Sequence, residues 1–395
     1  MYFAPNPSQE SIVIVSAART PMGGFQGDLS SMTAVELGTI AIKSALERAG
    51  VAPEKVSEVL MGCVLPAGTG QGPARQSTLN AGIPVYVPAT TLNKICGSGM
   101  KTVMLGATQL KVGEADLVVA GGMESMTNAP YLLDKARGGM RLGHGQIKDH
   151  MFTDGLEDAY CGMAMGVFAQ ETADRFGLTR EAMDDYALAS LDRANTAIKS
   201  GAFTEEIVPV ETQKGLVEID EQPGKARPEK VRRLRPAFTK DGTVTAANSS
   251  SISDGAAALI LMRERDAKAC GLQPIARISG YQSHAQKPEE FTIAPVGCIR
   301  KLLEKIDWQI HDVDLFEVNE AFAVVAMMAI RELALDHDKV NINGGACALG
   351  HPLGASGARI LVTLLHALKK TGGCKGIASL CIGGGEATAI AVEMV

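Results

Sequence analysis

The sequence predicts an α/β protein made of two similar units, with helices on both faces of its sheets. Apolar runs bounded by turn residues, such as SIVIVSAA from Ser11, are typical of strands buried on both faces. Amphipathic helical segments alternate with these runs. The segment from Ala41 to Gly62 also matches the segment from Cys298 to Asn319 without a gap, which indicates an internal duplication.

The elements of the first unit follow in order from this pattern. After the strand at Ser11, a helix is expected from Thr33, because Thr33 and Glu36 have capping-box spacing and Gly50 can stop the helix. The strand EVLMGCVLP follows at Glu58. A glycine turn that opens an apolar helix and the strand DLVVAGG complete the unit.

Two further matches extend the duplication. Ser98-Gly99 matches Ser356-Gly357, and the segment 118–125 resembles the segment 380–387. In this alignment, chemically reactive residues of one copy match unreactive residues of the other. The aligned pairs are Cys96 with Gly354, Asn319 with Gly62, and Cys381 with Val119. We therefore expect both halves to supply scaffold while one site forms between them.

The region between the two units has a different composition. Residues 125–249 combine glycine-rich and proline-punctuated charged segments around a long helical stretch, which is typical of an insertion with a surface function. Its basic run RPEKVRRLR, residues 227–235, is either a solvated face or a contact for substrate phosphates. We predict an N-terminal half at 10–124 completed by 250–272, a loop domain at 125–249, and a C-terminal half at 273–395.

Composition limits the function classes. The formal net charge of −6 argues against nucleic acid as the main partner. The longest apolar run, AFAVVAMMAI, is about half of the roughly 20 residues that a membrane span needs, so no membrane partner is expected. The N-terminus has no signal-peptide pattern, which predicts a cytoplasmic location. The eight cysteines show no zinc-like spacing, and no metal site is expected.

Cys96 is the first candidate for catalysis. It lies in LNKICGSGMKTVMLGA, where a glycine turn becomes a helix. A thiol there meets the positive end of the helix dipole and unpaired backbone N–H groups, which predicts a lowered pKa. The glycines allow a substrate to approach the backbone closely. This placement favours a nucleophile that forms a covalent intermediate.

Three further segments carry partners for such a nucleophile. His351, between Gly350 and Pro352, is the expected base, since a Cys–His pair is an activated-nucleophile arrangement. Cys381 ends an apolar strand before three glycines, where a second thiol can shuttle a proton and backbone N–H groups can stabilise an oxyanion. Asn319 ends its own strand and could orient a water or a histidine.

These segments together resemble the thiolase family over nearly the whole chain. NKICGSGMK, GGMESMTNAPY, NEAF, GGACALGHPLGASGAR and CIGGGEATA occur in the family's order and spacing. The resemblance implies a duplicated thiolase fold with a five-layered αβαβα core and an inserted loop domain that binds coenzyme A. It implies no permanently bound cofactor; the substrates would be coenzyme A thioesters.

The resemblance also implies roles for individual residues. Cys96 is similar to the acyl-accepting nucleophile, His351 to its base, and Cys381 to the acid/base that removes the α-proton of a second acetyl-CoA. Asn319 would hold a water that forms one oxyanion hole with His351, and the N–H groups of Cys96 and Gly383 would form the other. The implied reaction joins two acetyl-CoA molecules into acetoacetyl-CoA and free CoA, or runs in reverse.

The substrate contacts follow from the same resemblance. Ser250 and Ala246 would meet the pantetheine arm, and Lys225 and Arg227 are the expected contacts of the coenzyme phosphates. The residues expected to line the acyl pocket are Met165, Phe322 and Phe291. The segment RLGHGQIKDHMFTDGLEDAY resembles the loop through which short-chain members form tetramers, so a homotetramer, as a dimer of dimers, is expected.

Three departures from the family pattern affect expectations about chain length and ions. Ala164 stands where short-chain members usually have histidine, and Phe291 where methionine is common. Ser190 stands where potassium-dependent members have tyrosine, which argues against a potassium site. The alternative function of a 3-ketoacyl-CoA thiolase that accepts a broader range of chain lengths therefore stays open. So do a decarboxylating ketoacyl synthase, against which Cys381 argues, and a non-catalytic acyl-CoA-binding scaffold.

Overall fold

The computed structural model describes residues 10–395, and its central feature is a mixed sheet of ten strands. Its strands are β1 (Ile12–Arg19), β2 (Gly23–Gly24), β3 (Glu58–Gly62), β4 (Ala89–Leu92), β5 (Leu117–Ser125), β10 (Ser253–Arg263), β11 (Ala276–Ala285), β12 (Leu315–Val318), β13 (Lys375–Ile382) and β14 (Glu386–Met394). The helices are α1 (Ala34–Ala49), α2 (Pro73–Asn80), α3 (Ser98–Val112), α4 (Met165–Phe176), α5 (Arg180–Lys199), α6 (Glu221–Lys225), α7 (Glu264–Ala269), α8 (Ala294–Ile306), α9 (Ala323–Leu333), α10 (Ala346–Leu349) and α11 (Leu353–Thr371).

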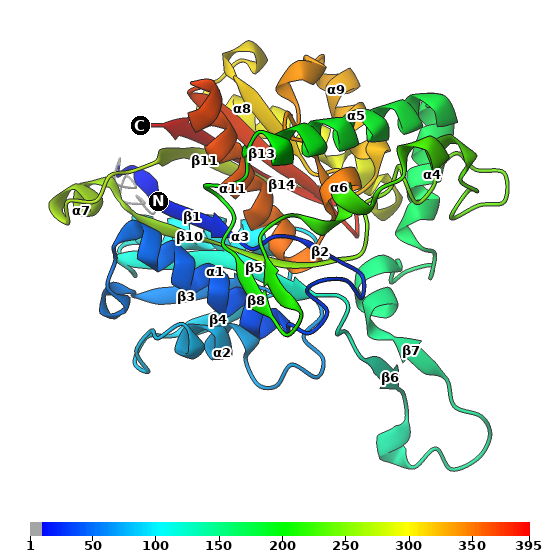
Figure 1. Cartoon of the computed structure of the whole chain (residues 1–395), viewed down its shortest axis with the longest axis horizontal. Helices are drawn as coiled ribbons and strands as arrows, with labels where there is room; N and C mark the ends of the chain where they lie inside the picture. Colours follow the sequence, from blue (N-terminus) through cyan, green and yellow to red (C-terminus); the bar gives the residue numbers. More distant parts are fainter. Residues whose placement is uncertain (1–9) are drawn as a thin grey trace, which may run out of the picture.

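The sheet consists of two halves with the order β4-β3-β5-β10-β1 and β11-β14-β13-β12. They meet at β1 and β11, which pair only through Val13 with Arg277 and Ile14 with Ala276. Helices α3 and α11 contact strands of both halves and lie between them, while α1 and α8 cover the outer faces (Figure 1). The predicted five-layered α/β architecture is confirmed.

Local sequence signals account for where the elements begin and end. The Thr33 hydroxyl accepts from the Glu36 N–H, and the Glu36 carboxylate accepts from the Thr33 N–H, so α1 has the predicted capping box. Gly50 ends the helix with a positive φ of 63°. Asp307 ends the matching helix α8 in the same left-handed conformation.

The strand registers support the duplication and correct one part of the alignment. Glu58 of β3 pairs with Val118 of β5, and the matching Leu315 of β12 pairs with Gly376 of β13. Counting along both strands, the structural equivalent of Cys381 is Met123, and not Val119 as predicted. The prediction failed because the glycines of VVAGGMES and LCIGGGEA were aligned, although the first pair lies within a strand and the second begins a turn.

The two central helices cross at glycines. A Cβ on Gly99 would lie 2.8 Å from the carbonyl oxygen of Gly354, and a Cβ on Gly357 would lie 2.4 Å from the backbone nitrogen of Met100. The N-terminal turns of α3 and α11 therefore approach backbone to backbone. This close contact brings the segments that precede both helices, with Cys96 and His351, to one region of the molecule.

We expect Gly357→Ala to destabilise the protein by about 1–3 kcal/mol, because the added methyl group would overlap backbone atoms that cannot move independently. Chemical denaturation would measure this loss. Gly138→Ala is the control, since nothing lies within 4 Å of a Cβ at that exposed position. Equal stability of the two variants would contradict a close helix crossing.

The segment between β5 and β10 supplies surface structure around the core. The hairpin of β6 (Tyr131–Leu133) and β7 (Ile147–Asp149) extends away from the body, while α4 and α5 lie beside α9 (Figure 1). A second small hairpin consists of β8 (Val210–Thr212) and β9 (Gly215–Val217). The proposed division into three domains stays a prediction. Among residues 10–395, no helix is long and apolar enough to cross a membrane.

Candidate active site

Cys96 occupies a tight turn between β4 and α3. The preceding Ile95 has a φ of 47°, a left-handed conformation that is strained for a β-branched residue. The Ser98 hydroxyl stabilises the turn, because its oxygen accepts from the Lys94 N–H at 2.8 Å and it donates to the Ile95 carbonyl at 2.6 Å. The turn therefore holds the thiol in one position ahead of the helix.

The electrostatic environment of Cys96 differs from the predicted one. Burial raises the pKa of the Cys96 thiol to about 11, although the backbone N–H groups of Gly383 and of Cys96 itself favour the thiolate. The expectation of a lowered pKa was wrong, because loss of solvent outweighs the helix terminus and its N–H donors. The two donors that converge on the sulfur are those expected to form an oxyanion hole.

The raised pKa predicts how Cys96 reacts with iodoacetamide. Since only the thiolate reacts, the alkylation rate should rise about tenfold per pH unit between pH 7 and pH 10 and level off near the pKa of about 11. Mass spectrometry of the Cys96 peptide would measure the rate, with the exposed Cys270 as an internal reference. A plateau below pH 8 would contradict the dominance of burial.

His351 directly precedes the N-terminus of α11 and is buried, with 5% of its surface exposed. Its Nδ1 lies 2.5 Å from the Ser356 hydroxyl, which donates to the Pro352 carbonyl at 2.9 Å. Because that hydroxyl has only one hydrogen, its oxygen accepts from Nδ1–H, which leaves Nε2 with the lone pair. Among residues 10–395, Nε2 has no hydrogen-bond partner.

Burial also determines the charge of this imidazole. It lowers the pKa of His351 to about 3, and the nearby Arg359 cation contributes in the same direction. The imidazole is therefore neutral at physiological pH and can accept a proton at Nε2. Together with the raised pKa of Cys96, this describes a neutral thiol and a neutral base rather than a preformed ion pair.

We expect Ser356→Ala to lower kcat about tenfold with little change in KM, because one hydrogen bond that selects the reactive tautomer is lost. Steady-state kinetics would measure both constants. Ser356→Thr, which retains the hydroxyl, should recover most of the rate. A rise in KM without a fall in kcat would contradict the orienting role of Ser356.

Cys381 lies at the end of β13, close enough to Cys96 for the charges to interact. Burial first, and then the Cys96 charge, raises the pKa of Cys381 well above its usual value. The next turn carries Gly383, whose N–H points to Cys96. An ion pair between Lys94 and Glu386 joins the turn before α3 to the start of β14. The two thiols thus come from opposite halves of the chain.

Asn319 follows β12, and its backbone N–H donates to the Ser379 carbonyl at 3.0 Å. Its side chain is buried, yet neither polar atom has a hydrogen-bond partner among residues 10–395. Buried polar atoms without partners are rare and point to a water or substrate contact.

The adjacent Glu320 explains the serine at position 190: its carboxylate accepts from the hydroxyl groups of Ser190 at 2.7 Å and Tyr186 at 2.9 Å.

Sequence reasoning missed Glu124, a fully buried carboxylate between the two halves. It accepts hydrogen bonds from backbone N–H groups of Val64 at 3.0 Å, Leu65 at 3.1 Å and Gly354 at 2.7 Å. Burial raises its pKa to about 7. Glu124 thus connects the end of β3 to the first turn of α11. Its place in the family block GGMES was the available signal.

Aromatic side chains form an apolar wall near the glycine turn. Met165 lies 3.6 Å from the position of a Cβ on Gly383. Phe322 makes edge contacts with Phe291 and Phe238, with ring centroids 6.2 Å and 5.9 Å apart. Phe238, which the sequence analysis did not single out, packs directly on Gly166.

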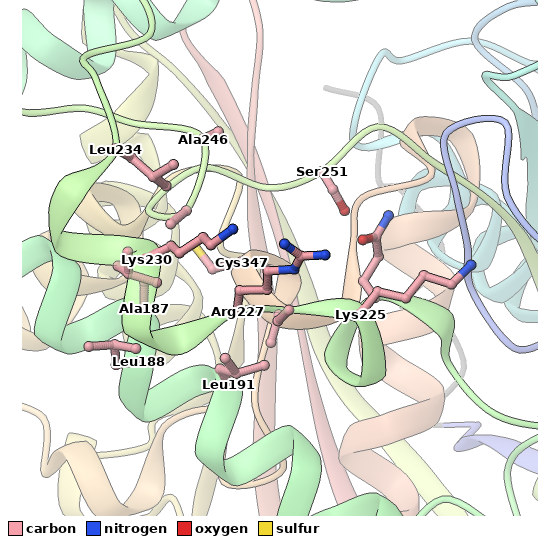
Figure 2. A pocket seen from close by; sticks show the side chains of 15 residues that line it. Ala187, Leu188, Leu191, Lys225, Arg227, Lys230, Leu234, Ala246, Ser251 and Cys347 are labelled. Atoms are coloured by element: carbon pink, nitrogen blue, oxygen red, sulfur yellow. The ribbon is translucent and has the colours of Figure 1, made fainter.

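A cavity of about 350 Å³ lies between α5, α6 and the segment 226–247 (Figure 2). Arg227, Lys230 and Ala246 line it, and Ser251 links it to the histidine, because the Ser251 carbonyl accepts from the His351 N–H at 3.2 Å. Lys225 also lines the cavity, but its ammonium group is paired with Glu221 and with Asp28, at 3.2 Å from the latter. Ser250 is not among the lining residues.

The arrangement supports covalent acyl transfer. A thiol that can accept an acyl group, a second thiol and two convergent N–H donors come together at the glycine turn. The neutral imidazole of His351 lies just before α11, whose first turn packs against that of α3. Among residues 10–395, no group of three or more His, Cys, Asp or Glu side chains is arranged to hold a metal ion.

Comparisons with known proteins agree with this geometry. The model of the thiolase N-terminal domain matches residues 12–265, and that of the thiolase C-terminal domain matches residues 272–394. The chain is 50% identical over 389 residues to an acetyl-CoA acetyltransferase of Cupriavidus necator, covering 97% of this chain and 99% of that protein. It is 51% identical over 391 residues to acetyl-CoA acetyltransferase 2 of Arabidopsis thaliana, covering 97% of each.

Solved structures are similar over the full length. The acetyl-CoA acetyltransferase of Bacillus anthracis has a TM-score of 0.95 at 43% identity, covering 99% of this chain and 100% of that one. The Acat5 thiolase of Ascaris suum, solved in complex with coenzyme A, has a TM-score of 0.94 at 42% identity, covering 98% and 100%. With both domain models matched in order and the fold shared along its whole length, the chain belongs to the thiolase family.

Proposed function

We propose that this chain is an acetyl-CoA C-acetyltransferase, which condenses two acetyl-CoA molecules to acetoacetyl-CoA and CoA and catalyses the reverse thiolysis. The observation that carries the proposal is the convergence of two buried thiols, Cys96 and Cys381, from opposite halves of the fold. The names of relatives about 50% identical over nearly the whole chain support the reaction and the coenzyme.

In the first half-reaction, Cys96 sulfur attacks the thioester carbonyl of acetyl-CoA, and Nε2 of His351 takes the thiol proton. The carbon–sulfur bond to CoA breaks, and Cys381 protonates the leaving thiolate. The N–H groups of Cys96 and Gly383 stabilise the oxyanion, since both donate toward the sulfur position. The products are S-acetyl-Cys96 and CoA.

In the second half-reaction, the Cys381 thiolate removes an α-proton from a second acetyl-CoA. Asn319, through a water, and His351 stabilise the enolate oxygen, and the carbanion attacks the acetyl group on Cys96. The Cys96 thiolate leaves and regains its proton from His351. The cycle thus returns every group to its starting protonation state.

The cavity beside α5 is the proposed site for the coenzyme. Arg227 and Lys230 extend into it and would meet phosphate groups, while Ala246 and the neighbouring Ser250 would meet the pantetheine arm (Figure 2). Lys225 would act less directly, because carboxylates already surround its ammonium group. The pocket formed by Met165, Phe322 and Phe291 would hold the acyl group.

A 3-ketoacyl-CoA thiolase of broader chain length is the second candidate. The rings of Phe291 and Phe322 are in edge contact. We infer that this contact narrows the pocket proposed for the acyl group, which favours the short-chain activity. Thiolysis rates for 3-ketoacyl-CoA substrates of increasing length would separate the candidates. We expect the four-carbon substrate to be cleaved fastest, with Phe291→Ala extending the range. Equal rates from four to eight carbons would favour the broader activity, and no thiolysis at all would leave only a binding scaffold.

We also propose a homotetramer, assembled as a dimer of dimers. The β6–β7 hairpin extends from the body and exposes apolar side chains, including Tyr131 at 69%, Leu142 at 99% and Ile147 at 70%. Several large apolar side chains exposed on one hairpin favour an interaction surface. Sedimentation analysis should show a tetramer that becomes a dimer when Leu142 and Ile147 are replaced by serine.

A further inference from the structure

A second cavity shares no lining residue with the cavity proposed to bind coenzyme A. It has a volume of about 400 Å³, within the range of roughly 300–1,000 Å³ typical of small-molecule sites. The end of α3, strand β11 and the end of α8 form its walls. We call it the β11 pocket, defined by Lys111, Arg277, Tyr281, Lys305, Trp308 and Glu393.

Positive charge dominates the β11 pocket. Lys111, Arg277 and Lys305 line it, against a single lining carboxylate, Glu393. The ammonium groups of Lys111 and Lys305 form no ion pair with any carboxylate among residues 10–395. Burial also lowers the pKa of Lys111, as expected for a cation without a compensating anion. This excess of positive charge is local, since the chain as a whole carries a net charge of −6.

The ring of Tyr281 contacts two of these cations. The ammonium groups of Lys111 and Lys305 lie 5.3 Å and 5.2 Å from the centre of the Tyr281 ring, and the Tyr281 hydroxyl is 2.7 Å from that of Thr108 on α3. Lys305 also donates to the Tyr281 carbonyl at 2.9 Å. Cation–π contacts leave ammonium hydrogens free for an anion, and they reduce the entropy lost when the anion binds.

A bulge in β11 lies in the wall of the pocket. The strand register shifts between Ile278 and Gly280, so Ser279 lies at a bulge. Bulges redirect side chains and are common beside binding sites. Ser279 lines the pocket, and its hydroxyl oxygen is buried without a hydrogen-bond partner among residues 10–395.

We propose that the β11 pocket binds a small phosphorylated metabolite through Lys111 and Lys305. Phosphate is favoured over carboxylate, because a guanidinium group is the donor that best matches a carboxylate, and the guanidinium group of Arg277 is already paired with Glu264 at 3.0 Å. The remaining donors are lysine ammonium groups, which act as point charges and suit the several oxygens of a phosphate. This binding is independent of the proposed acyl transfer.

Trp308 provides a direct readout, since it is the only tryptophan of the chain and lines the pocket. Inorganic pyrophosphate would be titrated into the full-length protein at an ionic strength held constant with KCl, and Trp308 fluorescence would be followed. We expect a saturable change, with a dissociation constant raised at least about tenfold in the double variant Lys111→Ala/Lys305→Ala. Lys43→Ala, which removes an exposed lysine from α1, is the matched control and should bind as the parent does.

Two further experiments test whether binding occurs at the β11 pocket and not elsewhere. Lys230→Ala, which alters the proposed coenzyme cavity, should leave the Trp308 signal unchanged. Calorimetry of Trp308→Phe should still detect binding at the β11 pocket. Unchanged pyrophosphate affinity in the lysine double variant, or a response that KCl alone reproduces, would overturn the site. Equal affinity for citrate would overturn the assignment to phosphate.

Discussion

Cys96→Ala is expected to lower the rates of condensation and thiolysis by about 10⁴-fold or more, since removal of a covalent nucleophile abolishes the acyl-enzyme route. The structural cost should be small, because the variant loses only a sulfur atom at a site that is 9% exposed. Both directions would be assayed with purified protein, and incubation with acetyl-CoA would be followed by intact-protein mass spectrometry. The parent should gain one acetyl group and the variant none.

Cys374→Ala is the matched control, because Cys374 is an exposed thiol remote from the glycine turn. It should retain the parent's rates and its acetylation. If Cys96→Ala kept the acetyl adduct on another cysteine, the nucleophile would be assigned to that residue. If both variants lost activity together, the effect would be one of folding rather than of chemistry.

Cys381→Ser is expected to separate the two half-reactions. A hydroxyl cannot remove the α-proton of a thioester near neutral pH, because its pKa is far above that of a thiol, so condensation should fall by about 10²–10⁴-fold. Acetylation of Cys96 should persist, although more slowly, since the nucleophile and His351 are unchanged and only the acid that protonates the leaving CoA thiolate is lost. Mass spectrometry would detect the acetyl-enzyme, and acetoacetyl-CoA formation would report condensation.

The loss in Cys381→Ser should appear in kcat and not in the KM of acetyl-CoA, because Cys381 is not among the residues that line the coenzyme cavity. Cys298→Ser tests whether any buried thiol of this half gives the same result, as Cys298 is fully buried on the inner face of α8. It should affect stability and spare condensation. Undiminished condensation in Cys381→Ser would remove the proton-transfer role.

Much of the fold could be predicted from local chemistry. The capping box at Thr33, the stop at Gly50 and the buried strand at Ile12–Arg19 depend on neighbouring residues, and the structure has all three. The duplication was also predictable, because two copies of one fold keep the same order of helices and strands. The residue equivalent to Cys381 in the other copy was not predictable, because a repeated pair of glycines gave a false alignment. Strand pairing shows that this equivalent is Met123.

Periodicity, caps and ordered motifs are local properties, so the α/β class, the duplication and the residue types of the candidate site could be predicted from them. The electrostatics of these residues depend instead on how the chain folds in three dimensions. Burial, which depends on how α3 and α11 pack between the sheets, raises the pKa of Cys96 where helix position alone predicts the opposite. Burial likewise makes His351 a neutral base and raises the pKa of Glu124, which lies between the halves. This exclusion of solvent arises from contacts among segments that are distant in the chain.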